Sequence, residues 1–278
     1  MAAILIIVGI VMIYPLLYEV FVSLSDPLEY VKQRGIMLRP AGFSLLAYKI
    51  ALGSKLIWSG FKNTLLIEVV GVTINLVMTS LGAYFLTRKN VLWKKPINFM
   101  IIVTMYFSGG LVPTYLAIRN YGLYNSFWAL VLPVALSTYN MILLRSYFAT
   151  IPDSLAESVT MDGGGHFTIL TQIYIPLSKP GMMVILLYYA VQHWNSWFSA
   201  SIYLRDSSEA PLQLVLRNMF EDESTNLLNL VQNYDNYDAL REPVKAAMMV
   251  ISTLPIICLY PFLQKYFEGG IMIGSLKE

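Results

Sequence analysis

The stretch that decides the fold is LLIEVVGVTINLVMTSLGAYFL, residues 65–86. Glu68 is its only acidic or basic residue, and a helix of this length, rising 1.5 Å per residue, spans the apolar core of a bilayer. A strand of a membrane barrel would instead alternate apolar and polar residues over about 10 positions. The stretch therefore predicts a transmembrane helix.

The whole chain has the same character. Its 19 basic and 17 acidic residues make up 13% of 278, against about 25% in a soluble domain, while the mean hydropathy is +0.59. We predict an all-α, polytopic membrane protein with about six transmembrane helices, forming one domain over residues 1–278. The apolar runs long enough to cross lie at approximately 2–24, 63–86, 97–118, 123–144, 181–204 and 244–264.

Several classes of protein and of site are excluded early. A net charge of +2 without a basic stripe argues against a nucleic-acid partner. Cys258 is the single cysteine, so neither an intrachain disulfide nor a CxxC metal site is possible. The first apolar run has no basic segment before it and no small-x-small cleavage pattern after it, so we expect a first span rather than a cleaved signal peptide.

Basic residues in the short loops predict the orientation. The connection 87–96 contains Arg88, Lys89, Lys94 and Lys95 and no acid, which indicates the cytoplasmic side. With six spans, both termini and segment 145–180 are then cytoplasmic, and segments 26–62 and 205–243 are external. Segment 26–62 disagrees with this assignment because it holds six basic and two acidic residues, although the rule weakens in longer loops.

Segment 145–180, called the hook below, is too long and too patterned for a simple connection. Pro152, followed by Ser154 and Glu157 at capping-box spacing, predicts a helix start. The three glycines 163–165 predict a sharp turn. A second helix is expected from about 166 to 173, ending before Pro176. Apolar contact surface is expected at Leu155, Val159, Phe167 and Ile169, and His166 is interpreted as an exposed loop residue.

The hook also carries a family resemblance. Residues Glu157-Ser158-Val159, Gly163 and Ile173-x-Ile175-Pro176 resemble the EAA-x3-G-x9-I-x-L-P motif of permease subunits in binding-protein-dependent ABC importers. The spacing matches throughout, with Ser158 and Val159 replacing two alanines and Ile175 replacing a leucine. Further similarities extend along the chain to 63–64, 83–88, 109–116 and the tail 266–278, which resembles carbohydrate permeases of the MalG and LplC subgroup.

The resemblance implies an assembly. This chain would be one of two different permeases that pair in a heterodimer in a bacterial cytoplasmic membrane. Two cytoplasmic ATPase subunits and an extracytoplasmic solute-binding protein would complete the assembly. The hook would be the coupling helix that docks on an ATPase, and Glu157 would contact it, although a capping role for Glu157 stays open. The residues that the motif assigns to coupling are Glu157, Ser158, Val159, Asp162, Gly163, Ile173 and Pro176.

Polar and aromatic side chains in the predicted fifth span suggest a sugar pathway, because hydroxyls need hydrogen-bond partners and sugar rings stack on aromatic faces. Interhelical hydrogen bonds and an interfacial aromatic belt are the alternative. Gln192, Asn195 and Ser196 are expected on one face, with His193 and Trp197 on the next. The candidates for solute contact are Gln192, His193, Trp194, Asn195, Trp197, Tyr139 and Asn140. The acidic loop 205–243 could contact the binding protein or could simply be a solvated face.

An enzyme is not expected. No lysine follows the glycines near 269–274 as a Walker A motif requires, so Mg-ATP would bind to partner subunits, and this chain would hold no cofactor or metal. His166 and His193 lie far apart in the sequence, and HExxH and GxSxG are absent. A secondary transporter and a membrane-embedded enzyme are the rival classes, but both leave the hook motif unexplained. A peptide or another organic solute is the alternative to a sugar.

Overall fold

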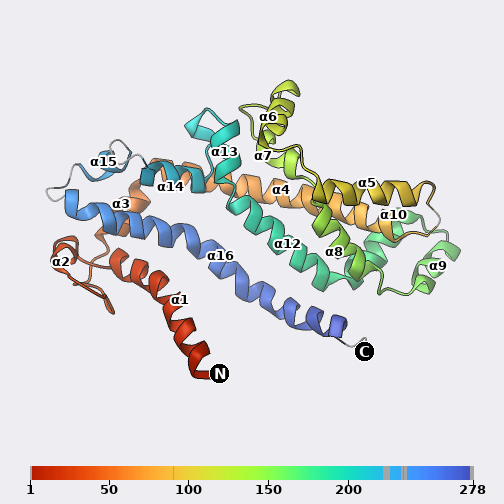
Figure 1. Ribbon diagram of the computed structural model, residues 1–278, viewed down its shortest axis with the longest axis horizontal. Coiled ribbons are helices and arrows are strands. Elements are labelled where there is room, and N and C mark those ends of the chain that lie inside the picture. The colour runs from red at the N-terminus through yellow and green to blue at the C-terminus, as the bar shows by residue number, and fades with distance from the viewer. Residues whose placement is uncertain (1, 90, 222–225, 233, 235–236, 276–278) are drawn as a thin grey trace. The chain divides into compact units, whose positions relative to one another are not determined.

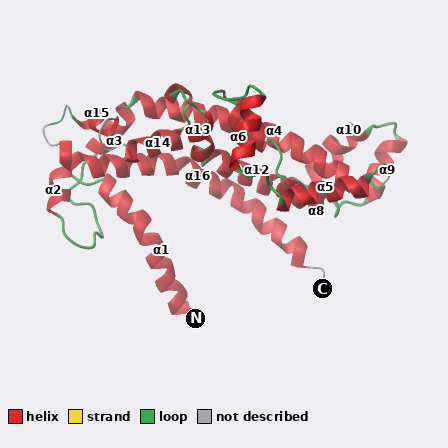
Figure 2. Ribbon diagram, turned by 45° about the horizontal axis from the view of Figure 1, so that its top comes forward, coloured by secondary structure: helices red, strands yellow, loops and turns green. Residues whose placement is uncertain are grey.

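The protein is all-α. The structure is a computed structural model that describes residues 2–89, 91–221, 226–232, 234 and 237–275. Every regular element in these ranges is a helix, as Figure 2 shows by its red ribbons, and the prediction of an all-α fold is confirmed. The contacts divide the chain into two compact units, which are described separately: Met1–Asn63 with Asp206–Cys258, and Thr64–Arg205 with Leu259–Glu278.

The first unit contains the amino-terminal helix and much of the predicted external segments. The helix α4 begins in this unit and continues into the second, as does α16. The elements of the first unit are α1 (Ala2–Ser23), α2 (Pro27–Lys32), α3 (Leu46–Gly53), the start of α4 (Lys55–Thr87), η3 (Ser207–Glu209), α14 (Leu212–Glu221), α15 (Asn226–Val231) and the first part of α16 (Tyr237–Ser275).

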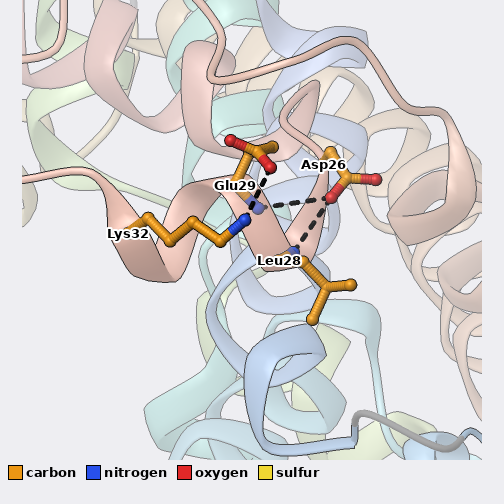
Figure 3. A network of polar contacts seen from close by, with 4 residues as sticks. All are labelled: Asp26, Leu28, Glu29 and Lys32. Carbon is orange, nitrogen blue, oxygen red and sulfur yellow. Dashed lines mark hydrogen bonds and ion pairs between the residues drawn. The ribbon is translucent and has the colours of Figure 1, made fainter.

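Segment 26–62 is a folded part of this unit, not a plain loop. Figure 3 shows its start, where the Asp26 carboxylate accepts hydrogen bonds from the backbone N–H groups of Leu28 (3.0 Å) and Glu29 (3.3 Å) and so caps α2. Later in the segment, the Ser59 hydroxyl donates to the Ser208 carbonyl at 3.2 Å, and Asn63, directly after the segment, donates to the carbonyls of Ser208 and Ala210. The two predicted external segments, 26–62 and 205–243, therefore pack on each other within one unit.

The second unit contains the rest of α4 and the hook, and Figure 1 shows α9 and α10 beside the end of α4. Its core includes Leu86, Leu144, Phe148, Tyr174 and Tyr189, all fully buried. Its remaining elements are α5 (Lys94–Tyr106), α6 (Leu111–Asn120), α7 (Trp128–Val131), η1 (Leu132–Val134), α8 (Thr138–Phe148), α9 (Asp153–Met161), α10 (His166–Ile169), η2 (Leu170–Tyr174), α11 (Ile175–Leu177), α12 (Lys179–Trp194) and α13 (Trp197–Tyr203).

Three described helices are long and apolar enough to cross a membrane: Ile4–Ser23, Lys55–Thr87 and Tyr237–Leu259. Three more candidates are helix pairs that bend by 115° (Lys94–Tyr106 with Leu111–Asn120), 50° (Trp128–Val134 with Thr138–Phe148) and 86° (His166–Leu177 with Lys179–Trp194). The total is six if each bent pair is one span. About six spans therefore stays a prediction.

The predicted spans 97–118, 123–144 and 181–204 are not continuous helices. The first is broken at Gly110, whose φ of 83° lies outside the helical region. The second is broken near Pro133, which lacks a backbone N–H group. The third ends at Trp194, and a new helix, α13, begins at Trp197. Hydrophobicity located these segments, but local backbone chemistry decided where each helix ends.

Candidate functional site

The hook begins with α9, whose start differs from the prediction. Pro152 occupies the N-cap position, with φ −61° and ψ 134°, and no side-chain hydrogen bond caps the helix. Ser154 therefore lies inside the first turn, and its carbonyl accepts a bond from the Ser158 hydroxyl. The predicted capping box between Ser154 and Glu157 is wrong, because Pro152 and not Ser154 occupies the N-cap position, and the proline side chain has no hydrogen-bond acceptor. Glu157 is exposed on α9.

The end of α9 lies at the glycines, as predicted. Gly163 has a φ of 82° and its N–H donates to the Thr160 carbonyl, while the Gly164 N–H donates to the Val159 carbonyl at 2.8 Å. These two bonds form a Schellman turn, which satisfies carbonyls that the last helical turn leaves unpaired. Asp162 is the C-cap residue. The turn reverses the chain between α9 and α10.

The second half of the hook is longer than predicted. The helix begins at His166, widens into a π-helical turn over Leu170–Tyr174, and continues through Pro176 to Leu177. The predicted end before Pro176 is therefore wrong. A π turn changes the carbonyl spacing, which relieves the clash that proline makes in a regular α-helix. Ile173 is half-buried against the core, and Pro176 is exposed.

The hook packs firmly on the second unit while leaving apolar side chains exposed. Ala156, Ile169 and Tyr174 belong to the buried core, so the expectation that Ile169 offers contact surface is wrong. Leu155 and Phe167 are exposed, Phe167 by 73%, as expected of a contact surface. Val159 is half-buried. Met161, 87% exposed, is an apolar surface residue that the sequence interpretation missed.

A cleft of about 650 Å³ lies between the hook and the end of α4. Arg88 lines the cleft and contacts two tyrosines. Its guanidinium lies 4.9 Å from the Tyr84 ring centroid and 5.1 Å from that of Tyr174, and it donates a hydrogen bond to the Tyr174 hydroxyl. The Tyr84 hydroxyl on α4 lies at hydrogen-bond distance, 3.0 Å, from Nδ1 of His166. His166 is the first residue of α10, so the expectation that it lies in a loop is wrong. The lining includes Tyr84, Arg88, Lys89, Asp153, Glu157 and His166.

Two of the lining residues, Lys89 and Asp153, form an ion pair. Lys89 Nζ lies 2.7 Å from an Asp153 carboxylate oxygen, and both side chains are exposed. The hydrogen bond and charge of this pair raise the pKa of Lys89 and lower the pKa of Asp153. Sequence spacing could not have found this pair, because the two residues come from different elements. Only the fold brings them together.

The candidate solute residues separate into a buried and an exposed set. His193, Trp194 and Asn140 are buried, with 5% of the side chain or less exposed. Gln192, Asn195 and Tyr139 are exposed, and Trp197 is half-buried. Because α12 ends at Trp194, the predicted face shared by His193 and Trp197 does not exist within one helix, and the cluster lies at a helix end instead of mid-span.

His193 has a protein partner in the interior. Its Nε2 atom lies 2.7 Å from Oδ1 of Asn75, and Asn75 Nδ2 donates to the Val134 carbonyl at 2.5 Å. Gly71 makes room for the imidazole, since a Cβ there would lie 2.7 Å from Nε2. These contacts favour the interhelical alternative for His193. Asn195 also bonds locally, to the Val191 carbonyl at 2.8 Å.

The remaining sequence predictions concern the acidic loop 205–243, metal sites and the single cysteine. The acidic run at 221–225 and the run 233–238 lie mostly outside the described residues. Among described residues, no group of three or more His, Cys, Asp or Glu side chains could hold a metal ion. Cys258 is exposed and free.

The chain is similar in sequence to known transport proteins. Residues 76–273 match the family described as binding-protein-dependent transport system inner membrane component. The chain is 34% identical to the polygalacturonan/rhamnogalacturonan transport system permease protein YtcP of Bacillus subtilis, over 97% of this chain and 94% of the relative. It is 36% identical to protein LplC of the same organism, over 97% and 91%.

A solved structure shares the fold. It is the crystal structure of a bacterial ABC transporter involved in the import of the acidic polysaccharide alginate, and its matching chain is 32% identical in sequence. The TM-score is 0.89, and the match covers 96% of this chain and 94% of the other. The agreement therefore extends over nearly the full length of both chains.

Proposed function

This chain belongs to the family of binding-protein-dependent transport system inner membrane components, and from that premise we propose that it is the permease subunit of an ATP-driven importer for sugars or oligosaccharides. It would form part of the solute pathway and change between inward-open and outward-open states. The family is one of membrane transport components, so ATP hydrolysis is assigned to separate ATPase subunits with their Mg-ATP.

The observation that carries the coupling role is the surface of the hook. Glu157 is exposed on α9, Leu155 and Met161 expose apolar side chains on the same helix, and Phe167 exposes its ring on α10. Exposed apolar groups together with a charge are typical of a protein-binding surface. The Schellman turn and the buried Ile169 and Tyr174 make this surface rigid, which a segment that transmits motion requires.

The solute class rests on similarity. The relative YtcP is named for polygalacturonan and rhamnogalacturonan, and the solved relative imports alginate. We extend carbohydrate import from those proteins to this chain. A peptide or another organic solute is the competing assignment, since amide and aromatic side chains bind many compounds.

The proposed partners are a second permease, two cytoplasmic ATPases and an extracytoplasmic solute-binding protein. The basic connection 87–96 supports a cytoplasmic position for the hook and both termini. The ATPases would then meet the hook, and the binding protein would meet the opposite side.

Co-purification tests the proposal. The tagged chain is isolated from its native membrane as the native form, as Glu157→Lys and as Phe167→Ala, and its companions are identified by mass spectrometry. We expect an ATPase and a second permease with the native chain, and loss of the ATPase with both variants. The matched control is Glu209→Lys, which reverses an exposed acid outside the hook and should retain the ATPase.

Two results would contradict the proposal. One is a native chain that purifies alone and binds no ATPase when one is supplied. The other is ATP hydrolysis by the isolated chain, which is expected to show none. Thermal unfolding of each variant in detergent distinguishes loss of docking from loss of folding.

A further inference from the structure

The broken helix before α8 leaves two backbone groups that side chains satisfy. The Val134 carbonyl accepts from Asn75 on α4, and the Ser137 N–H donates to the Tyr189 hydroxyl on α12 at 3.0 Å. Broken helices at membrane depth persist only where neighbours replace the missing bonds. The break between η1 and α8 is therefore held from both sides.

The four side chains around the break form two rungs, called the polar ladder. His193 lies 2.7 Å from Asn75, and one helical turn away the Tyr189 hydroxyl lies 2.7 Å from that of Thr79. All four are buried, with no more than 1% of any side chain exposed. The ladder fixes which face of α12 points into the protein.

The residues next to the ladder on α12 lie on an exposed face of the helix. Tyr188 is 43% exposed, and its ring centroid lies 6.4 Å from that of Tyr139, the second residue of α8, which is 53% exposed. Gln192 follows one turn after Tyr188 and is also exposed. In the part of the chain that the structure describes, the Gln192 side chain makes no hydrogen bond. These three residues form the aromatic strip.

The aromatic strip is poorly suited to lipid. Two phenol groups and an unpaired amide share a face of two helices that belong to candidate spans, where polar groups are costly unless they meet a cavity or another protein group. Two aromatic rings and a neighbouring amide also suit a sugar. The C–H faces of a sugar ring stack on aromatic rings, and its hydroxyls form hydrogen bonds with an amide.

We propose that Tyr139 and Tyr188 form an aromatic platform for a sugar ring in the solute pathway, with Gln192 bonding a hydroxyl of that ring. The polar ladder holds the platform by fixing the broken end of α8 against α12. The inference rests on the proposed function and adds Tyr188 to the solute-contacting residues. It also assigns His193 and Asn75 as positioning residues.

Cysteine accessibility in the assembled importer tests whether the strip faces water. In a Cys258→Ser background, Tyr188→Cys and Gln192→Cys are labelled with a charged, membrane-impermeant methanethiosulfonate. Ala190→Cys is the buried control, and Ile10→Cys, 63% exposed on the apolar α1, is the lipid-facing control. We expect labelling at 188 and 192 to be at least tenfold faster than at either control position. Rates equal to the controls would place the strip against lipid or the partner permease and overturn the proposal.

Uptake kinetics test the sugar contact itself. Cells with the whole importer are given oligogalacturonides and, separately, raffinose, and Tyr188→Ala is compared with Tyr188→Trp. We expect Tyr188→Ala to raise KM about tenfold while Tyr188→Trp stays near native. An unchanged KM in Tyr188→Ala would overturn the platform.

The two proposals fail in different ways. Absence of uptake of either sugar by the native importer would count against the solute class in the proposed function, and the labelling rates would still decide whether the strip lines the pathway. Absence of a co-purifying ATPase would contradict the importer assignment without changing those rates.

Discussion

At the scale of single residues, neighbouring positions in the hook region carry very different constraints. Arg88 packs over two tyrosine rings, while Lys89 makes an ion pair at the surface. Gly164 touches Val159, while Gly165 has open space where a side chain would be. Such adjacent pairs provide matched controls, because a structural role predicts an effect at one member only.

Replacing Arg88 by alanine should destabilise the second unit. A guanidinium over aromatic rings is worth about 0.5–2 kcal/mol, and the variant also removes the bond to the Tyr174 hydroxyl. Thermal unfolding of the detergent-purified chain should therefore shift downward by several degrees. Lys89→Ala should leave the transition unchanged, since its ion pair is exposed. Equal shifts in the two variants would show that Arg88 is not a packing residue.

Replacing Gly164 by alanine should distort the hook. The new Cβ would lie 2.5 Å from Cγ1 and 2.9 Å from the carbonyl oxygen of Val159, and overpacking of this kind costs about 1–3 kcal/mol. We expect weaker ATPase binding, measured by co-purification yield. Gly165→Ala should be neutral, and adding Val159→Ala to Gly164→Ala should recover part of the yield. A neutral Gly164→Ala would mean that the turn can open without loss of docking.

At the scale of elements, breaks in helices organise the second unit. The bends of 115° and 50° divide apolar runs that a hydrophobicity pattern treats as continuous, and a third such run is interrupted where α12 ends at Trp194. Each break exposes backbone groups that need partners, and the polar ladder supplies them at the break before α8. The elements are therefore coupled through hydrogen bonds as well as apolar packing.

A double-mutant cycle measures one rung of the ladder. Thr79→Val and Tyr189→Phe each remove one hydroxyl of the 2.7 Å pair and keep the shape of the side chain. We expect each single variant to lower thermal stability in detergent, with a coupling energy of about 0.6–1.7 kcal/mol, as for other hydrogen bonds within membranes. Strictly additive losses would mean that the two hydroxyls act independently. Thr73→Val is the control, since that hydroxyl bonds only to its own helix.

At the scale of the whole molecule, the sequence leaves one conflict over orientation. The basic connection 87–96 predicts the cytoplasm for the hook, yet the predicted external segment 26–62 holds six basic residues. The structure shows that this segment is folded and paired with the 206–210 region. Folded segments follow the basic-residue rule less closely than short loops, so the assignment from 87–96 is the one we expect to hold.

Labelling from either side of the membrane tests this orientation. In the Cys258→Ser background, Met161→Cys on the hook should react with an impermeant maleimide only in inside-out vesicles. Glu209→Cys should react only in right-side-out vesicles, and both positions are exposed on this chain. The reverse pattern would mean that the basic residues of 26–62 decide the topology.

The sequence by itself determined the helical membrane fold, the hook and its glycine turn. These follow from composition, apolar run length and local backbone preference, all of which are properties of consecutive residues. Motif spacing also located Glu157, which the structure leaves exposed on α9.

Only the tertiary structure decided which polar residues are exposed and which are buried. Gln192 and His193 are adjacent in the sequence, yet one is exposed and the other bonds to Asn75 inside the protein. The contacts of Arg88 with Tyr174 and of Tyr189 with Ser137 likewise join residues from separate elements. A helix presents its faces by rotation about its axis, and that rotation is set by packing against its neighbours, which no local pattern contains.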